Sequence, residues 1–439
     1  MKAAPFYLLN LGCAKNLVEG EHLAGMLLAA GCRSVTNPDD ARLLIVNTCG
    51  FIKPAVQEAL EAVLSLSAGK KPGQFLVVAG CLVGRYGKKL ACSLPEADLL
   101  VAPGETHRLL EHLACPPPGR LAISPPRRIF TAKNPRSLAT GPGWAYLRIA
   151  DGCGHKCAFC TIPRIRGPLR SRVISDILAE AGRLAGSGIV EINLVAQDLT
   201  AYGRDIYGRS TLKRLIGELA AIDSLKWVRL LYLHPDSLDN SLLKTVFDTP
   251  KALRYFDLPI QHVADPVLRA MGRQKTGEKL RRLVRAIREG HPAATLRATL
   301  LVGHPGEGPE EFAELLEFVK EGWFDHLGCF AYQAETGTKS ARLAAPPVKE
   351  RLKRQRKIMA AQKKISRQKL ARLKGQKTEV LVLGPHPESD LLWQGRLASQ
   401  APEVDGEVII TSGNARPGTI APAVITKTHA YDVEAELLE

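Results

Sequence analysis

Three short apolar runs in the first hundred residues each lead directly into a cysteine. They read FYLLNLGC, LLIVNTC and FLVVAGC, and they end at Cys13, Cys49 and Cys81. Two stretches between them, at about 16–30 and 54–68, carry apolar residues at helical spacing. The order strand, helix, strand, helix, strand predicts right-handed crossovers and hence a parallel sheet of the α/β class.

The carboxyl ends of parallel strands lie along one edge of a sheet, and this edge is where sites form. We therefore expect Cys13, Cys49 and Cys81 to meet there, although more than thirty residues separate each from the next. A free cysteine taken singly is most often a small buried apolar residue. Three of them at the ends of three strands favour a set of ligands.

The composition is that of a globular protein of two or three domains without a membrane segment. Hydrophobic residues make up 45% of the 439 residues, and no apolar run approaches the length that spans a bilayer. The ten cysteines are unevenly spaced and do not resemble the framework of a secreted disulfide-rich protein. They favour a reducing, cytoplasmic location in which thiolates are kept for metal or for chemistry.

A Pro-rich segment with little pattern, from residue 115 to about 143, is predicted to be a linker. Beyond it, strand-like runs and helical stretches alternate. Six runs are strand candidates: 144–150, 191–196, 228–233, 255–260, 296–302 and 326–332. Six strand–helix units within about 190 residues suit an open, partial (β/α)6 barrel better than a closed barrel of eight.

The last part of the chain combines a basic stretch with an acidic tail. Residues 349–377 carry thirteen Lys and Arg and only Glu350 as an acid, which accounts for +12 of the net charge of +16. Residues 378–439 have a net charge of −7 and alternate short strand patterns with turns, as a small β-barrel does. The sequence thus predicts four parts: an N-terminal parallel-sheet domain (1–135), a partial barrel (136–347), a basic connecting helix (348–377) and a small C-terminal β-barrel (378–439).

The stretch DGCGHKCAFC places Cys153, Cys157 and Cys160 just after the first strand of the predicted barrel. A zinc site needs a fourth ligand, and His155 is a candidate inside the loop. A histidine between two ligands is, however, poorly placed to reach the same ion. Three thiolates on a short loop instead fit three irons of a [4Fe–4S] cluster. The remaining iron is then open to a small molecule that binds through an amine and a carboxylate.

The spacing C-x3-C-x-Φ-C, with Phe159 before the last cysteine, resembles the signature of radical S-adenosylmethionine (SAM) enzymes. LGCAKNLVEGE, IVNTCGFI and AGCLVGRY, with a C-terminal barrel that resembles a TRAM domain, are similar to the methylthiotransferases of this superfamily over essentially the whole chain. The resemblance implies that SAM completes one [4Fe–4S] cluster and that Cys13, Cys49 and Cys81 hold a second [4Fe–4S] cluster. One SAM would supply a methyl group and another the radical, so that the cofactors carry the chemistry. No catalytic acid or base is assigned.

The same resemblance extends to the SAM pocket. LLVGHPGE resembles a strand-end glycine segment of the family and points to Gly303 and Pro305, whereas NLVAQDLTAYG points to Gln197 and Asp198. Phe159 completes this cofactor-binding set. The alternative for the two segments is a Gly/Pro turn and a capped helix start. The other cysteines match no motif and are expected to be packed residues: Cys32, Cys92, Cys115 and Cys329.

Two branches of the methylthiotransferase family differ in substrate. One modifies an adenosine of tRNA beside the anticodon; the other modifies the β-carbon of an aspartate in uS12, the small-subunit ribosomal protein of the decoding centre. An RNA-binding face is expected to be basic, whereas residues 378–439 are acidic and suit a basic protein. QAPEVDGEVIIT and LPIQHVADPVLRAMGR also resemble the ribosomal-protein branch. The sequence therefore favours uS12, free or in ribosomal particles, as the partner.

Two alternatives stay open at this point. One is a tRNA adenosine methylthiotransferase, and the other is an iron–sulfur protein that binds RNA without catalysis. The basic helix supports RNA binding; its alternative role is a solvated helix that joins the two barrels and packs through Leu352, Met359, Ile365 and Leu373. The sequence identifies neither the sulfur donor nor the electron donor.

Overall fold

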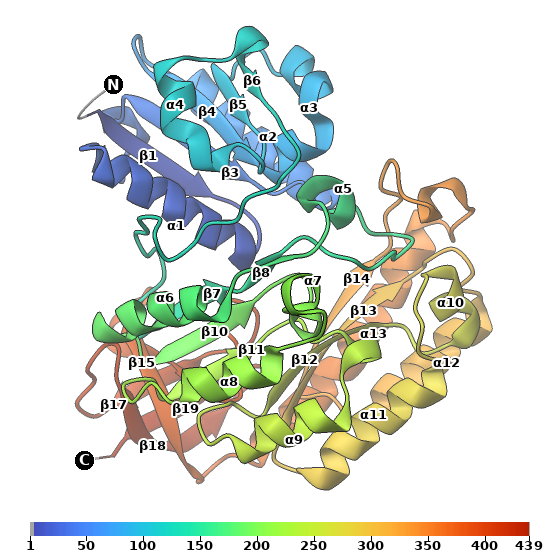
Figure 1. The fold of residues 1–439 in the computed structure, drawn as a ribbon. Coiled ribbons are helices and arrows are strands. Elements are labelled where there is room, and N and C mark those ends of the chain that lie inside the picture. Colours follow the sequence, from blue (N-terminus) through green and yellow to red (C-terminus); the bar gives the residue numbers. More distant parts are fainter. Residues whose placement is uncertain (1–3, 439) are drawn as a thin grey trace.

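The computed structural model describes residues 4–438, which form three packed parts (Figure 1). An α/β domain built from the N-terminal residues lies at the top of Figure 1, and a larger α/β unit lies below it. A small β-barrel, coloured red, lies at the lower left against the larger unit. The chain passes through the three parts in sequence order.

The N-terminal part is a six-stranded parallel sheet, as the sequence predicts. Its strands are β1 (Pro5–Asn10), β2 (Arg33–Ser34), β3 (Leu43–Thr48), β4 (Phe75–Gly80), β5 (Leu99–Val101) and β6 (Leu121–Ala122), in the spatial order β2-β1-β3-β4-β5-β6. Its helices are α1 (Ala14–Ala29), α2 (Lys53–Ala68), α3 (Cys81–Ser93) and α4 (Leu109–Ala114). One apolar cluster joins α1 and α4 to one face of the sheet, and another joins α2 and α3 to the other face. All six residues of β3 are buried, which explains its nearly continuous apolar sequence.

The Pro-rich segment is only partly a linker. Leu121 and Ala122 form β6, which pairs with β5 and completes the N-terminal sheet. Phe130 is buried and stacks on His22 of α1, with ring centroids 4.6 Å apart. Arg136 then pairs with Glu21 of α1 at 2.6 Å. The segment is therefore fixed along α1, because Phe130 and Arg136 contact side chains of that helix.

The middle part has the six predicted strands in two three-stranded parallel sheets. One sheet contains β7 (Trp144–Arg148), β10 (Glu191–Val195) and β11 (Trp227–Leu230); the other contains β12 (Tyr255–Gln261), β13 (Thr295–Val302) and β14 (His326–Ala331). The sheets meet where Leu233 donates its backbone N–H to the Asp257 carbonyl oxygen at 2.9 Å. Within residues 4–438, β7 and β14 are not paired, so the barrel is open and partial, as expected. A two-stranded ribbon, β8 (Ala150–Asp151) and β9 (Arg170–Ser171), follows β7.

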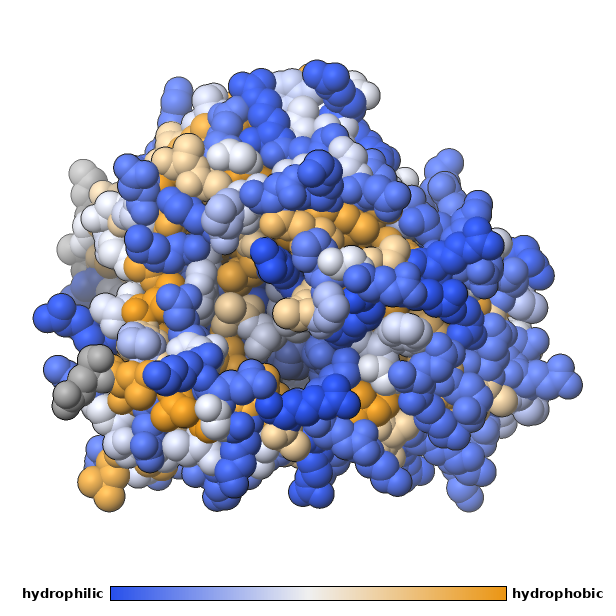
Figure 2. Space-filling view, turned by 90° about the horizontal axis from the view of Figure 1, so that it is seen from below, coloured by the Kyte–Doolittle hydropathy of each residue, from blue (hydrophilic) through white to orange (hydrophobic). Residues whose placement is uncertain are grey.

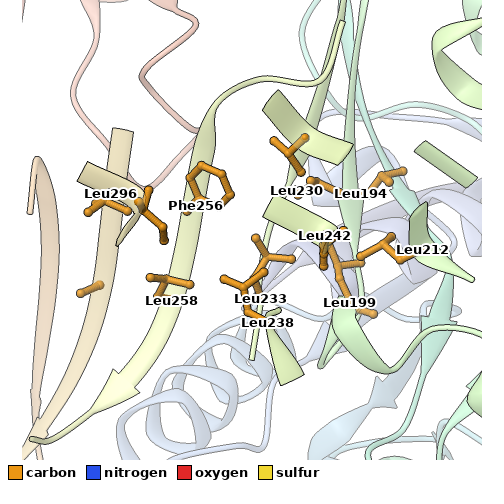
Figure 3. Packing of buried hydrophobic residues seen from close by; sticks show 14 of the residues in the cluster. Leu194, Leu199, Leu212, Leu230, Leu233, Leu238, Leu242, Phe256, Leu258 and Leu296 are labelled. Carbon is orange, nitrogen blue, oxygen red and sulfur yellow. The ribbon is translucent and has the colours of Figure 1, made fainter. Parts of the chain in front are cut away.

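The helices of this part are α5 (Ile162–Arg166), α6 (Ile174–Gly186), α7 (Arg204–Tyr207), α8 (Leu212–Ala220), α9 (Asn240–Asp248), α10 (Asp265–Ala270), α11 (Gly277–Gly290) and α12 (Pro309–Lys320). Most of them cover the outside of the open barrel, whereas α5 lies between the barrel and the N-terminal domain. The buried residues of α8 recur at helical spacing: Leu212, Leu215, Ile216 and Leu219. Figure 3 shows Leu212 and Leu242 of α8 and α9 in the same apolar cluster as Leu194, Leu230 and Phe256 of the strands.

The basic helix α13 (Val348–Ala371) packs along α12 and β14. Gln355 donates to the Cys329 carbonyl oxygen of β14 at 2.7 Å, so a helix side chain satisfies backbone of the last strand. The fully buried apolar residue of the helix is Ile358. Met359, Ile365 and Leu373 pack as expected. The expectation for Leu352 is wrong, because this side chain is 44% exposed and points away from the core contact.

The C-terminal part is the predicted small β-barrel. Its strands are β15 (Lys377–His386), β16 (Ser389–Leu397), β17 (Val408–Ser412), β18 (Ile420–Thr428) and β19 (Val433–Leu437), which close in the order β15-β16-β17-β19-β18. The inward-facing residues are apolar and include Val380, Val382, Val408 and Ile410. Closure removes the exposed strand edges that a small open sheet would present.

The loop 398–406, between β16 and β17, lies at the amino ends of the strands of the open barrel. Asp405 on this loop has a fully buried carboxylate that pairs with Arg297 of β13 and accepts from the Tyr255 hydroxyl at 2.6 Å. Its Oδ1 lies 3.4 Å from His326 Nδ1. Tyr255 and His326 are the first residues of β12 and β14. The loop therefore closes the amino end of the barrel.

A second buried group of charges joins the same two parts. Glu191, the first residue of β10, pairs with Arg396 of β16 and with Arg229 of β11 at 3.0 Å. Arg229 also donates to the Ala398 carbonyl oxygen at 2.8 Å. All three charged side chains are buried, and a buried charge is tolerated only when it is paired in this way.

Replacing Asp405 with Asn is expected to destabilise the folded chain by about 3 kcal/mol at pH 7, since Arg297 would lose the closer of its two buried carboxylate partners, Asp405 and Asp257. Burial disfavours the charged form, but His326, Arg297 and the Tyr255 hydroxyl outweigh it and lower the pKa of Asp405. The stabilisation is thus present above the ordinary pKa of about 3.9 and is lost as the pH falls toward the lowered folded value. Denaturant titrations at pH 7 and pH 3 measure it, with exposed Asp390→Asn as control. Equal stabilities of wild type and Asp405→Asn at pH 7 would contradict the assignment.

No helix within residues 4–438 is both long enough and apolar enough to cross a membrane. Figure 2 shows the face that lies at the bottom of Figure 1. Hydrophilic residues cover most of this face, and apolar residues occur on it in separate patches.

Candidate functional site

The first cysteine set (Cys13, Cys49 and Cys81) lies at the carboxyl edge of the N-terminal sheet, as predicted. Cys49 directly follows β3, Cys81 directly follows β4, and Cys13 follows β1 and precedes α1. Because β1, β3 and β4 are neighbours in parallel pairing, their ends bring the three residues together. Gly12 has a φ of +95°, and a Cβ at this position would lie 2.5 Å from the Cys49 Cβ. Glycine is therefore required for this close approach.

Arg166, the last residue of α5, connects the first cysteine set to the barrel. Its Nε and Nη2 donate to the Cys81 sulfur at 3.2 and 3.1 Å. The same guanidinium pairs with Glu19 of α1 and lies 3.5 Å from the Asp151 carboxylate. Arg166 is buried. It thus joins the N-terminal domain to the barrel through charges that neither part could bury alone.

The second cysteine set occupies the loop after β8. It comprises Cys153, Cys157 and Cys160. Backbone hydrogen bonds fix the loop: the Ala158 N–H donates to the Met271 carbonyl oxygen at 2.9 Å, and the Ser340 N–H donates to the Ala158 carbonyl oxygen at 3.0 Å. The backbone at Met271 and Ser340, both distant in sequence, therefore holds this loop in its conformation.

Lys15 and Arg166 lower the pKa of the Cys13 thiol against the effect of burial, but burial raises the pKa of the other five thiols of the two sets. Burial raises the pKa of Cys153 to about 11 and that of Cys160 to about 12. In the first set, burial raises the pKa of Cys81 to about 12, although Arg166 opposes it. Metal ligation requires thiolates, so loading either site releases protons.

The loops that carry the two sets touch each other. Thr161, which follows Cys160, donates its hydroxyl to the Phe51 carbonyl oxygen at 3.2 Å, and Phe51 lies two residues after Cys49. The buried pair Arg85–Glu335, at 2.6 Å, joins the same two parts nearby. Figure 1 shows α5, just beyond the second set, between the N-terminal domain and the barrel. The two cysteine sets consequently face each other across one interface.

Neither set has the geometry of a single-ion site. Among the described residues, no three Cys, His, Asp or Glu side chains converge closely enough to ligate one metal ion. Zinc requires such convergence, whereas the thiolates of a [4Fe–4S] cluster bind separate irons. His155, the candidate fourth zinc ligand, contacts Asp198 at 2.7 Å through Nε2 and stacks on His234. His155 is therefore engaged by Asp198 and His234, and three thiolates without a fourth protein ligand suit separate irons of a [4Fe–4S] cluster better than one zinc ion.

Gln197 and Asp198 lie beside the second cysteine set. Gln197 donates through Nε2 to Asp151 at 2.8 Å, while its Oε1 is buried with no hydrogen-bond partner among residues 4–438. A buried acceptor of this kind is a contact that a polar ligand can satisfy. Asp198 caps a short turn by accepting from the Thr200 N–H at 2.8 Å. Asp198 therefore caps the start of a short helical turn, which was the alternative to a cofactor contact, and it also contacts His155.

Phe159, Gly303 and Pro305 lie close together on the barrel side. The Phe159 ring stands edge-on to His304, with centroids 6.1 Å apart. Gly303 has a φ of +72°, and a Cβ there would lie 2.1 Å from the Arg351 Cγ, so the turn needs glycine. The Pro305 carbonyl oxygen lies 2.8 Å from His304 Nδ1. The Gly/Pro turn is present, and it borders the loop of the second cysteine set.

Several polar residues at the interface were not identified from the sequence. They are Lys15, Glu19, Arg166 and His234. The sequence signal for this interface was the pair of acidic residues Glu19 and Glu21 in α1. Both are buried, and acidic residues become buried only when they are paired. Among the cysteines outside motifs, Cys329 is buried as expected, whereas Cys92 and Cys115 are exposed, so the packing expected for these two is wrong.

Three family models match the chain. Residues 5–102 match the uncharacterized protein family UPF0004, residues 147–319 match the radical SAM superfamily, and residues 375–438 match the TRAM domain. The radical SAM match includes the loop of the second cysteine set. Membership of this superfamily implies SAM and a [4Fe–4S] cluster as cofactors.

Curated relatives match nearly the full length. The ribosomal protein uS12 methylthiotransferase RimO of Syntrophobacter fumaroxidans is 45% identical over 439 residues, which cover 98% of each chain. This chain belongs to the RimO family. Proteins of the same name from Geobacter sulfurreducens and Myxococcus xanthus are each 43% identical, over 98% and 99% of this chain and 98% and 91% of their own. The resemblance to radical SAM methylthiotransferases found in the sequence is thereby confirmed.

Solved structures share the fold of this RimO-family chain. The radical SAM methyltransferase TsrM from Kitasatospora setae, with tryptophan and a SAM analogue bound, superposes with a TM-score of 0.55 at 16% identity, over 75% of this chain and 73% of its own. The cobalamin-dependent radical SAM enzyme OxsB gives a TM-score of 0.50 at 12% identity, over 82% and 56%. At these identities the similarity concerns the fold alone.

Proposed function

We propose that this chain adds a methylthio group to the β-carbon of an aspartate in uS12. The observation that carries the proposal is the contact between the two loops with cysteine sets, one from the N-terminal sheet and one from the barrel. A sulfur carrier and a radical source must reach the same substrate carbon, and facing sites provide that proximity. Relatives named for uS12 methylthiotransferase activity support the choice of reaction.

In this proposal each cysteine set holds one [4Fe–4S] cluster, in the reducing cytoplasm. Residues 1–135 carry the cluster on the first set, and residues 136–347 carry the cluster on the second set together with SAM. SAM, when bound, supplies both the methyl group and the radical. The free acceptor of Gln197 supports a polar contact to SAM, with Phe159, Asp198, Gly303 and Pro305 around it. Arg166 orients the Cys81 sulfur.

The surface of the C-terminal barrel (378–439), which helix 348–377 connects to the core, supports a basic protein as substrate. Several of its acidic side chains are exposed: Glu379, Glu388, Asp390, Glu403 and Glu436. Of its cations, Arg396 is buried against Glu191 and Lys427 pairs with Glu434 at 2.8 Å. The outward charge therefore stays acidic, since the burial of Arg396 is balanced by that of Asp405, and this disfavours phosphate contacts and favours a basic ribosomal protein.

Mass spectrometry after anaerobic reconstitution tests the proposal. The full chain is incubated with SAM and dithionite, and either uS12 or tRNA lacking the methylthio group is added. We expect a methylthio gain on one uS12 aspartate and none on tRNA. A gain on tRNA alone would reject the proposed substrate. Absence of SAM cleavage by chain that carries both clusters would favour an iron–sulfur protein without catalysis.

A further inference from the structure

Lys15 is a buried ammonium group beside the first cysteine set. It lies two residues after Cys13, in the first turn of α1, and its side chain crosses to the barrel. Its Nζ stands 3.5 Å from the centroid of the Tyr232 ring. Lys15 is only 9% exposed, and within residues 4–438 no carboxylate lies at ion-pair distance from it. A desolvated cation without a carboxylate partner is costly and is therefore informative.

Neighbouring cations at the same interface are already neutralised. Arg166 pairs with Glu19, and Arg148 lies 3.8 Å from Glu19 and 4.0 Å from Asp151. Arg85 pairs with Glu335. Lys15, in contrast, is a cation of this interface that no carboxylate within residues 4–438 neutralises by an ion pair.

The position of Lys15 is one that a substrate can approach. Gly12 and Cys13, on the turn just before it, are exposed, so solvent-accessible space adjoins the first cysteine set. Tyr232, beneath the ammonium, follows β11 and has a φ of +65°. Non-glycine residues in this conformation are strained and concentrate at functional sites. Two residues further, His234 stacks on His155 of the loop that carries the second set. Lys15 therefore lies where the two sets meet.

We infer that Lys15 is a carboxylate-binding site and holds the side-chain carboxylate of the substrate aspartate. The inference rests on the proposed function, because that reaction places a methylthio group on the carbon next to a carboxylate. The ring and the hydroxyl of Tyr232 position the ammonium, and its remaining hydrogens are left for an anion. A fixed cation at this point both orients the β-carbon between the two cysteine sets and rejects a neutral base such as adenine.

Binding of uS12 tests the inference without catalysis. The dissociation constants of uS12 and of its Asp→Asn form, substituted at the modified aspartate, are measured by fluorescence anisotropy with reconstituted full-length chain. We expect wild type to bind the aspartate form about 10- to 100-fold more tightly, since hydrogen bonds between charged groups are the strong ones. In Lys15→Gln the two forms should bind equally. Lys53→Gln is the matched control, because Lys53 is an exposed lysine of the same domain, and it should preserve the preference.

Three results of the binding and iron measurements would overturn the inference. They are equal binding of both uS12 forms by wild type, a preference that survives in Lys15→Gln, and loss of iron or of cluster absorbance in Lys15→Gln, which would assign the lysine to cluster retention. Loss of SAM cleavage in that variant with iron intact would assign Lys15 to the SAM carboxylate instead and would overturn it as well. Failure of the proposed function is separate: wild-type chain would leave the uS12 aspartate unmodified whatever the binding constants.

Discussion

Replacing Cys157 with alanine is expected to abolish the cleavage of SAM. Cys157 is the middle residue of the second cysteine set, and the loop is too tightly held for another side chain to take its place. The two remaining thiolates cannot retain the cluster that reduces SAM. The rate of SAM cleavage should therefore fall by the whole enzymatic acceleration, which is about 10⁶-fold or more. Release of 5′-deoxyadenosine in the presence of dithionite, measured by chromatography, reports this directly.

Cys115→Ala is the control for this experiment. Cys115 is exposed and follows α4, away from both sets, so the same substitution there should leave SAM cleavage at the wild-type rate. Iron analysis should show that Cys157→Ala keeps the iron of the first set. Cleavage at the wild-type rate by Cys157→Ala would mean that the second set does not bind the cluster.

Replacing Cys49 with alanine should separate the cleavage of SAM from the transfer of the methylthio group. Cys49 is buried at the end of β3, in close contact with Gly12, and belongs to the first set alone. We expect the variant to lose one cluster, to continue cleaving SAM, and to add no methylthio group to uS12. The physical reason is that the second set stays intact on its own loop while the sulfur carrier is gone. Iron content, 5′-deoxyadenosine and the mass of uS12 are measured on the same sample.

Cys92→Ala provides the matched control, since Cys92 is an exposed cysteine on α3 in the same domain. It should keep both clusters and full transfer. Methylthiolation by Cys49→Ala would rule out a cluster on the first set. Loss of SAM cleavage in Cys49→Ala would instead mean that the two sites are not independent.

The sequence predicted the sheet architecture and both cysteine sets because these depend on local pattern. The runs before Cys49 and Cys81 are apolar over most of their length, which is typical of strands buried on both faces. Parallel pairing then brings their ends to one edge, whatever the details of packing. The six strands of the partial barrel followed from the same alternation. The second set lies on one short loop, so its spacing alone indicated its chemistry.

Contacts between distant segments could not be predicted in this way. Arg166 and Cys81 are 85 residues apart, and nothing local indicates that a guanidinium after one loop will donate to a sulfur on another. The same holds for Lys15 and Tyr232. Leu352 was expected to pack because it is apolar, yet the face of α13 that meets α12 and β14 is set by tertiary contacts, and Ile358 lies on that face instead.

The position of loop 398–406 also has a consequence for modularity. A chimera that carried the C-terminal barrel of another protein would lose Asp405 and Arg396 together. Arg297 and Glu191 would then each keep only one buried partner, Asp257 and Arg229 respectively. The C-terminal barrel therefore cannot be replaced by that of another protein as an independent domain. Substitutions in this domain that alter the choice of substrate are therefore restricted to its outward-facing strand residues. Substitutions in loop 398–406 require matching substitutions at the amino ends of the six barrel strands.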